Sequence, residues 1–204
     1  MSRPATHHDS RRRALIAAAE AVFVQKGYRA TTLNDLLAAT GTSKGGFYHY
    51  FESKDEVLRA SLDGVLEEAA EVLRSAATLE VTPTDRLTTV FRGMREVRAR
   101  HGEFARMLAV IVGDETPASA FHNDVIRRLA PPLALVIAHF PVAEPRYTAE
   151  LLLDALTSVS RSPNRTGYLA EPQAQAGLAT ALRELLSRTL GINADDPSLS
   201  SFGW

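Results

Sequence analysis

Helix start and stop signals recur along almost the whole sequence, whereas the apolar–polar alternation of a β-strand is nearly absent. Four prolines stand where a first helical turn accepts them, because the N–H that proline lacks has no intrahelical partner there. They belong to the pairs Thr82-Pro83, Thr116-Pro117, Glu144-Pro145 and Glu171-Pro172. Gly102, Gly113 and Pro141 supply stops between them. The pattern predicts an all-α fold of about nine helices.

The N-terminal region predicts four of these helices. They are expected to start near Asp9, Thr32, Ser43 and Ser53, and the first three to end at Gly27, Gly41 and about Tyr50. Thr32 and Asp35 have the spacing of a capping box, and Ser53 and Glu56 repeat it.

Two later stretches predict interruptions. Pro131-Pro132 lies inside an apolar helical series, so we expect a kink or break there. The stretch "RSPNRTGY", residues 161–168, is expected to be a loop, and residues 193–204 a disordered or loosely attached tail.

Composition indicates a soluble globular protein. Apolar residues make up 45% of the chain and charged residues 23%, and no apolar run reaches the roughly 20 residues of a membrane span. The basic N-terminal residues are not followed by the apolar segment of a secretory signal, so we expect a cytoplasmic protein with no membrane partner. The chain has no cysteine, and His101, His122 and His139 lie on separate segments, so neither a metal site nor a cofactor is expected.

Charge is divided unevenly. Residues 1–50 carry seven Lys/Arg and three Asp/Glu, a balance of +4, and since the whole chain carries -1 the remainder carries -5. This division suggests a small basic module attached to an acidic body, although terminal arginines are often simply solvated.

The stretch "TGTSKGGFYHYFESKDEVL", Thr40 to Leu58, carries the strongest functional signal. Two short helices joined by a tight glycine turn have the outline of a helix-turn-helix, whose second helix enters the DNA major groove. Gly45 and Gly46 would allow close approach to DNA, and Phe47 is expected to point inward. The alternative, that the glycines only make a turn and the aromatic residues only fill a core, remains open at this point.

The segment "ATTLNDLLAATGTSKGGFYHYFESKDEVLRA", Ala30 to Ala60, resembles the DNA-binding region of the TetR family of bacterial transcriptional regulators. The resemblance implies a homodimer with one N-terminal DNA-reading head per subunit and a larger helical body that binds a small molecule. The DNA-binding residues that it implies are Thr32, Thr42, Ser43, Lys44, Gly45, Gly46, Tyr48, His49, Tyr50 and Lys54. Thr32 would cap its helix at the phosphate backbone, Lys54 would contact a phosphate, and Arg11 to Arg13 would form a flexible arm.

Apolar and aromatic residues of the body are candidates for a ligand cavity, with Arg98 or His122 supplying polarity. The candidates are Phe91, Met94, Arg98, Met107, Ile111, Phe121 and His122. The same residues would also suit an ordinary core between helices.

Two segments, residues 151–156 and 178–190, are too apolar for a lone subunit. They predict a four-helix dimer interface. The residues assigned to it are Leu152, Leu156, Leu178, Leu182, Leu185 and Leu186. Two such subunits would read a nearly palindromic operator.

The sequence therefore predicts a flexible arm over residues 1–9, a helix-turn-helix domain over 10–56, a ligand-binding and dimerisation domain over 57–192 and a tail over 193–204. The expected function is that of a ligand-responsive regulator, most often a repressor in this family, and not an enzyme. One alternative is an all-α enzyme that uses His122 with Asp124 or His101 with Glu103. The other is an architectural DNA-binding protein, which the acidic body disfavours.

Overall fold

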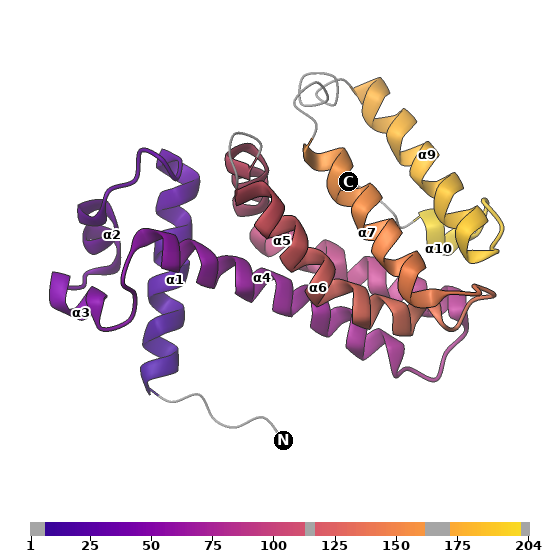
Figure 1. Ribbon diagram of the computed structural model, residues 1–204, viewed down its shortest axis with the longest axis horizontal. Helices are drawn as coiled ribbons and strands as arrows, with labels where there is room; N and C mark the ends of the chain where they lie inside the picture. Colours follow the sequence, from indigo (N-terminus) through magenta and orange to yellow (C-terminus); the bar gives the residue numbers. More distant parts are fainter. Residues whose placement is uncertain (1–6, 113–116, 162–171, 201–204) are drawn as a thin grey trace. The chain divides into compact units, whose positions relative to one another are not determined.

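The computed structural model describes residues 7–112, 117–161 and 172–200, and every regular element among them is a helix (Figure 1). The helices are α1 (His7–Lys26), α2 (Leu33–Thr40), α3 (Lys44–Tyr48), α4 (Lys54–Ala77), α5 (Pro83–Val112), α6 (Pro117–Ile137), α7 (Pro145–Arg161), α9 (Pro172–Leu190) and α10 (Pro197–Ser200). The predicted all-α fold is confirmed.

The chain divides into two compact units, which α4 and α5 both enter. The first unit consists of the chain up to Val65 together with His101–Ile111, and the second unit consists of the remainder. The first unit contains the predicted helix-turn-helix.

Proline marks helix starts as predicted. Pro83, Pro117, Pro145 and Pro172 are the first residues of α5, α6, α7 and α9. Thr82 supports the start of α5, because its Oγ1 accepts a hydrogen bond from the backbone N–H of Asp85 at 3.1 Å.

Two predicted helix breaks are absent. Gly102 lies inside α5, which is a single helix of 30 residues, and Pro131-Pro132 lies inside the continuous helix α6. One glycine in a helix interior costs about 1 kcal/mol, which burial of Val97 and Phe104 on the same helix can offset. The described helices number nine, as expected, but α5 replaces two of the expected helices and α10 was not foreseen.

The ends of the chain differ from the prediction too. Helix α1 begins at His7, so residues 7–9 are helical rather than part of an arm, and residues 1–6 lie outside the described residues. Over 193–200 the expected loose tail is wrong, because Leu199 of α10 is fully buried in the core of the second unit. Residues 201–204 lie outside the described part.

The core of the first unit fixes the position of α3. Phe47 of α3 is 1% exposed and packs in a cluster of buried residues that also contains Leu15, Phe23, Leu36 and Phe51. A helix of five residues is not stable alone in water, so this packing holds α3 in place. The expected inward orientation of Phe47 is confirmed.

The second unit has its own core, built from α4, α5, α6, α7, α9 and α10. Buried Arg86 of α5 closes the end of α4, where its guanidinium donates hydrogen bonds to the carbonyl oxygens of Ala76 and Leu79. The carbonyl oxygen of Ala76 also accepts the backbone N–H of Leu79 at 3.3 Å, so Arg86 adds a second donor at this helix end.

Candidate nucleic-acid interface

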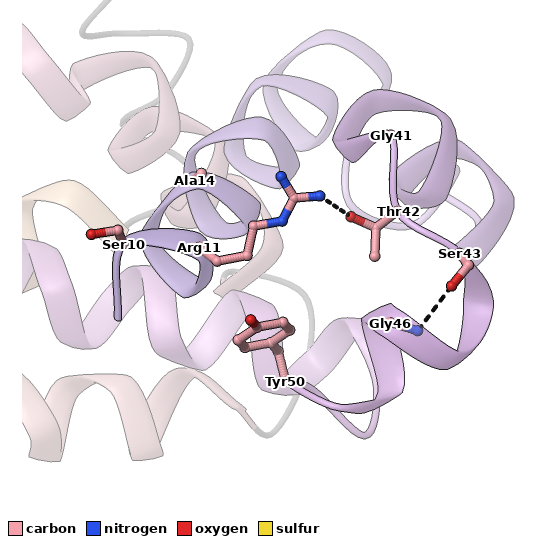
Figure 2. Close-up of a pocket in the computed structure, with 8 residues that line it drawn as sticks. All are labelled: Ser10, Arg11, Ala14, Gly41, Thr42, Ser43, Gly46 and Tyr50. Atoms are coloured by element: carbon pink, nitrogen blue, oxygen red, sulfur yellow. Dashed lines mark hydrogen bonds between the residues drawn. The ribbon is translucent and has the colours of Figure 1, made fainter. Parts of the chain in front are cut away.

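The turn between α2 and α3 consists of Gly41, Thr42 and Ser43 (Figure 2). Gly41 has a φ of +59°, a left-handed conformation that glycine adopts without penalty, and its N–H donates to the carbonyl oxygen of Leu37. Ser43 then caps α3, because its Oγ accepts a hydrogen bond from the N–H of Gly46 at 3.1 Å. Two helices separated by so short a turn form a helix-turn-helix.

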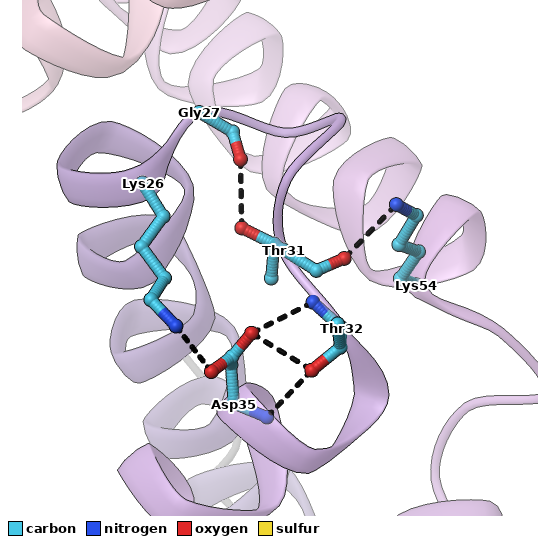
Figure 3. Close-up of polar contacts among 6 residues, drawn as sticks. All are labelled: Lys26, Gly27, Thr31, Thr32, Asp35 and Lys54. Atoms are coloured by element: carbon cyan, nitrogen blue, oxygen red, sulfur yellow. Dashed lines mark hydrogen bonds and ion pairs between the residues drawn. The ribbon is translucent and has the colours of Figure 1, made fainter.

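The start of α2 has the predicted capping box (Figure 3). Thr32 Oγ1 accepts from the N–H of Asp35 at 3.3 Å, and Asp35 Oδ2 accepts from the N–H of Thr32 at 2.9 Å. The Asp35 carboxylate also pairs with Lys26 of α1. The Lys26 ammonium, followed by the N–H of Thr32, holds the pKa of Asp35 well below its usual range.

Lys54 has partners inside the chain, which differs from its expected role. Its Nζ donates a hydrogen bond to the carbonyl oxygen of Thr31 at 3.0 Å (Figure 3) and another to the carbonyl oxygen of Tyr28 at 3.1 Å. The ammonium also lies 4.6 Å from the centre of the Tyr28 ring, within cation–π distance. These carbonyls give the ammonium partners inside the chain, so its position in α4 does not by itself indicate an external anion, and the phosphate contact of Lys54 stays a prediction.

Several residues predicted to face DNA are exposed at the short helix α3. Tyr48 is 47% exposed, Lys44, Gly45 and His49 are exposed, and Phe47 on the opposite face is buried. The run of aromatic residues therefore divides between core and surface. We call the group Lys44, Gly45, Tyr48 and His49 the α3 face.

The two glycines of α3 differ in their surroundings. A Cβ at Gly45 would meet no atom within 4 Å, so nothing within the described chain requires glycine there. A Cβ at Gly46 would lie 2.8 Å from Cγ2 of Thr42, which is too close. Gly46 is therefore explained by the turn itself, and close approach to DNA stays a prediction for Gly45.

The three consecutive arginines lie within helix α1 and have three different partners. Arg11 Nη2 donates to Thr42 Oγ1 at 3.0 Å, Arg12 lies 5.0 Å from the centre of the Phe51 ring, and Arg13 Nε donates to the carbonyl oxygen of Asp9. They do not form the flexible arm expected from the resemblance. Sequence analysis missed the link between Arg11 and the turn, because nothing in the spacing of two segments reveals their contact.

Rings gather beside the α3 face. The imidazole of His8 lies over half-buried Tyr50, with ring centres 4.7 Å apart, and His49 lies edge-on to both rings.

The predicted ligand residues are divided between the two units, because the backbone of Met107 and Ile111 belongs to the first unit. Phe91 and Met94 are partly buried against the core, and Arg98 is exposed, so Arg98 does not act as a buried polar group. The side chains of Met107, Ile111 and Phe121 lie outside the described residues. A surface groove of about 520 Å³ lies between α4 and α5, and none of the described ligand candidates lines it.

His122 joins α6 to α7. Its Nε2 lies 2.7 Å from Oδ1 of Asp154 and its Nδ1 lies 3.0 Å from Oγ1 of Thr157. Asp124, its expected catalytic partner, pairs instead with Arg127. His122 therefore acts as a link between helices in this structure, and not as part of the expected pair. Within the described residues, no cluster of three or more potential metal ligands occurs.

Several residues assigned to the dimer interface belong to the core of a single subunit. Leu152, Leu182 and Leu186 are 5–7% exposed, and Leu156 and Leu178 are half-buried. Leu185 of α9 is 41% exposed, and Tyr147 and Leu151 of α7 are 59% and 68% exposed. Both predicted helices therefore carry exposed apolar residues, but among the residues assigned to the interface Leu185 is exposed, whereas Tyr147 and Leu151 were not assigned to it.

Residues 15–61, which include the whole helix-turn-helix, match the family described as bacterial regulatory proteins, tetR family. Over these residues the chain matches the TetR family. Its relatives include the HTH-type transcriptional repressor KstR2 of Mycobacterium tuberculosis, 35% identical over 105 residues that make up 50% of each chain. The repressor NemR of Escherichia coli is 30% identical over 114 residues, 54% of this chain and 55% of its own. The chain thus spans about half the length of the curated relatives it matches.

Solved structures extend the likeness in fold to most of the chain. SmeT, the repressor of the Stenotrophomonas maltophilia multidrug efflux pump SmeDEF, has a TM-score of 0.64 and 22% identity, with 91% of this chain and 90% of its own covered. Reduced E. coli NemR has a TM-score of 0.63 and 20% identity, with 90% and 96% covered. At this level of identity the likeness concerns the fold alone. No helix in the described ranges is long and apolar enough to cross a membrane.

Proposed function

We propose that this protein is a cytoplasmic, homodimeric transcriptional regulator that binds double-stranded operator DNA and is released from it by a small molecule. The observation that carries this proposal is the α3 face, where Lys44, Gly45, Tyr48 and His49 are exposed beside buried Phe47. Phe47 packs in the core of the first unit, so the polar and cationic groups of the α3 face lie outside that core. The family match over residues 15–61 supports the same conclusion.

DNA recognition would use the α3 face in the major groove. Lys44 and the polar tips of Tyr48 and His49 can meet phosphates or base edges, while Gly45 allows the helix backbone to come close. Thr32, at the start of α2, remains a proposed contact with the DNA backbone, and Thr42, Ser43, Gly46 and Tyr50 remain proposed contacts or supports for the turn.

A regulator rather than an enzyme fits both the family and the surroundings of His122. KstR2, NemR and SmeT are each named as repressors, which supports repression as the mode of action. The ligand-binding role of the second unit rests on the family alone. Its ligand would be a small, largely apolar molecule that favours one conformation of the body.

Dimer formation would place two α3 faces on successive major grooves. Half-site centres would then lie about 34 to 36 Å apart, or a multiple of that distance, and the operator would be an inverted repeat. Exposed Leu151 and Leu185 support α7 and α9 as the pairing helices, because water-exposed leucines on two long helices favour a partner surface.

The test is selection of duplexes from a random pool with the purified protein, at a stated salt concentration. We expect an inverted repeat whose affinity exceeds that of a scrambled duplex by about 10³-fold or more. Recovery of random duplexes with equal affinity would instead identify a non-specific DNA-binding protein, and recovery of no duplex would refute DNA binding altogether.

A further inference from the structure

A cleft of about 620 Å³ opens in the first unit between the start of α1 and the helix-turn-helix (Figure 2). Ser10, Arg11 and Ala14 line it from α1, and the turn residues Gly41, Thr42 and Ser43 line it from the other side. Gly46 and Tyr50 complete it. The cleft therefore borders the residues that begin α3.

The chemistry of the cleft suits an anion. None of the residues that line it is acidic, and Arg11 brings a guanidinium whose charge is permanent at any physiological pH. The Tyr50, Ser10 and Ser43 hydroxyls add neutral donors. Ser43 Oγ already accepts the N–H of Gly46, so its own hydrogen is available to an acceptor in the cleft.

One hydrogen bond holds Arg11 in place, and the guanidinium keeps further N–H donors for a second acceptor. Its Nη2 donates to Thr42 Oγ1 at 3.0 Å, and this is its one hydrogen bond within the described part of the chain. A guanidinium has five N–H donors, so several remain for a second acceptor. The bond to Thr42 fixes the direction of the guanidinium, which lowers the entropy lost when an anion binds.

We propose that this cleft binds a backbone phosphate of the operator, with Arg11 as its principal contact. This inference rests on the proposed function. If the α3 face enters a major groove about 12 Å wide, one sugar–phosphate strand bordering that groove passes beside the start of α3, where the cleft lies. A phosphodiester has the charge, the acceptors and the size that the cleft accommodates.

The matched control is Arg13, two residues further along α1. Two residues turn a helix by about 200°, so Arg13 points away from Arg11. Its Nε donates to the carbonyl oxygen of Asp9, and Arg13 does not line the cleft. Arg13→Gln therefore removes the same charge from the same helix without touching the proposed site.

The experiment uses the full chain and the duplex selected by the wild-type protein. Dissociation constants are measured for wild type, Arg11→Gln and Arg13→Gln between about 50 and 200 mM salt, after thermal melts establish that each variant is folded. We expect Arg11→Gln to flatten the slope of log K against log salt by about 0.9 per reading head, and Arg13→Gln to leave the slope unchanged.

Thr42→Val separates phosphate binding from mere support of the turn. It removes the hydroxyl that holds Arg11 while keeping the charge and the shape of the side chain. If Arg11 only holds the turn, Arg11→Gln and Thr42→Val weaken binding equally and neither changes the salt slope. That result overturns the inference, whereas a slope change confined to Arg11→Gln supports it.

Methylphosphonate substitution locates the phosphate. Each phosphate of the selected duplex is replaced in turn by the uncharged analogue, and binding of wild type and Arg11→Gln is compared. We expect one position per half-site at which the difference between the two proteins disappears. A constant difference at every position overturns the inference while leaving operator binding intact, and failure of wild type to select any duplex overturns the proposed function itself.

Discussion

Gly45 and Gly46 are neighbours in α3, but the space available for a side chain differs between them. Gly46 has no room for a side chain, because Thr42 Cγ2 would lie 2.8 Å from the added Cβ. Gly45 has open space, so a methyl group there meets nothing inside the described chain. The sequence predicted one reason for both glycines, close approach to DNA, and could not separate them, because the conflict with Thr42 depends on the path of the turn.

Gly45→Ala should therefore stabilise the protein and weaken its function. Alanine restricts the unfolded chain and favours helix, so we expect a gain of about 0.4 to 1 kcal/mol in the free energy of unfolding. Operator affinity should fall about tenfold if α3 lies close to the bases. Denaturant titration and binding to the selected duplex measure the two effects. Gly46→Ala is the comparison, with an expected loss of about 1 to 3 kcal/mol from overpacking.

Asp35 predicts a pH dependence of stability. Its pKa is held well below the usual range in the folded state, first by Lys26 and then by Thr32, so its ionised form stabilises the fold. That contribution is fully present above the unfolded-state pKa of about 3.9 and is lost as pH falls below it toward the folded-state pKa. Asp35→Asn should be less stable than wild type at pH 7, and the gap should narrow as pH falls below about 4. Denaturation midpoints at several pH values test this, and a gap independent of pH would refute it.

At the scale of elements, Lys54 connects α4 to the segment between α1 and α2 through Tyr28 and Thr31. Lys54→Met keeps the aliphatic length and loses these bonds. Because hydrogen bonds from a charged group contribute about 1.5 to 3 kcal/mol, we expect a loss of that order in stability. The salt slope of operator binding should stay near that of wild type. A flattened salt slope with unchanged stability would instead support the phosphate contact of Lys54 that the sequence predicted.

Helix boundaries were predictable where a local rule decides them. Pro83, Pro117, Pro145 and Pro172 begin helices as expected, because the constraint on proline acts within one turn. Gly102 did not stop a helix, because its cost of about 1 kcal/mol is smaller than what packing of neighbouring residues supplies. Leu199 is buried although its segment has no helical periodicity to reveal it.

At the scale of the whole molecule, burial separates core leucines from those available to a partner. Leu151 and Leu185 are exposed, whereas Leu182 is 5% exposed within its own subunit. Periodicity placed all of them on apolar helices but could not tell which face packs on the subunit. The predicted ligand residues show the same limit, since the sequence assigned both exposed Arg98 and partly buried Met94 to one cavity.

Leu151→Arg and Leu185→Arg should therefore yield folded monomers. Each places a charge in the proposed interface without disturbing the core, and operator affinity should fall because the second reading head no longer binds as part of one molecule. Sedimentation and circular dichroism measure assembly and folding. Leu135→Arg is the control, because Leu135 is 58% exposed on α6, outside the proposed interface, and this variant should remain dimeric. Leu182→Arg should instead lose about 3 kcal/mol or more of stability. Dimers that survive both Leu151→Arg and Leu185→Arg would place the interface elsewhere.

The central claim is that the α3 face reads operator DNA, and the most direct measurement is the ratio of affinities for the selected and scrambled duplexes in wild type and Tyr48→Ala. Tyr48 is 47% exposed, so its loss should leave the fold intact. We predict a wild-type ratio of about 10³ or more, and a loss of about 1 to 3 kcal/mol in Tyr48→Ala confined to the selected duplex. Equal ratios in wild type and in a folded Tyr48→Ala variant would contradict the claim.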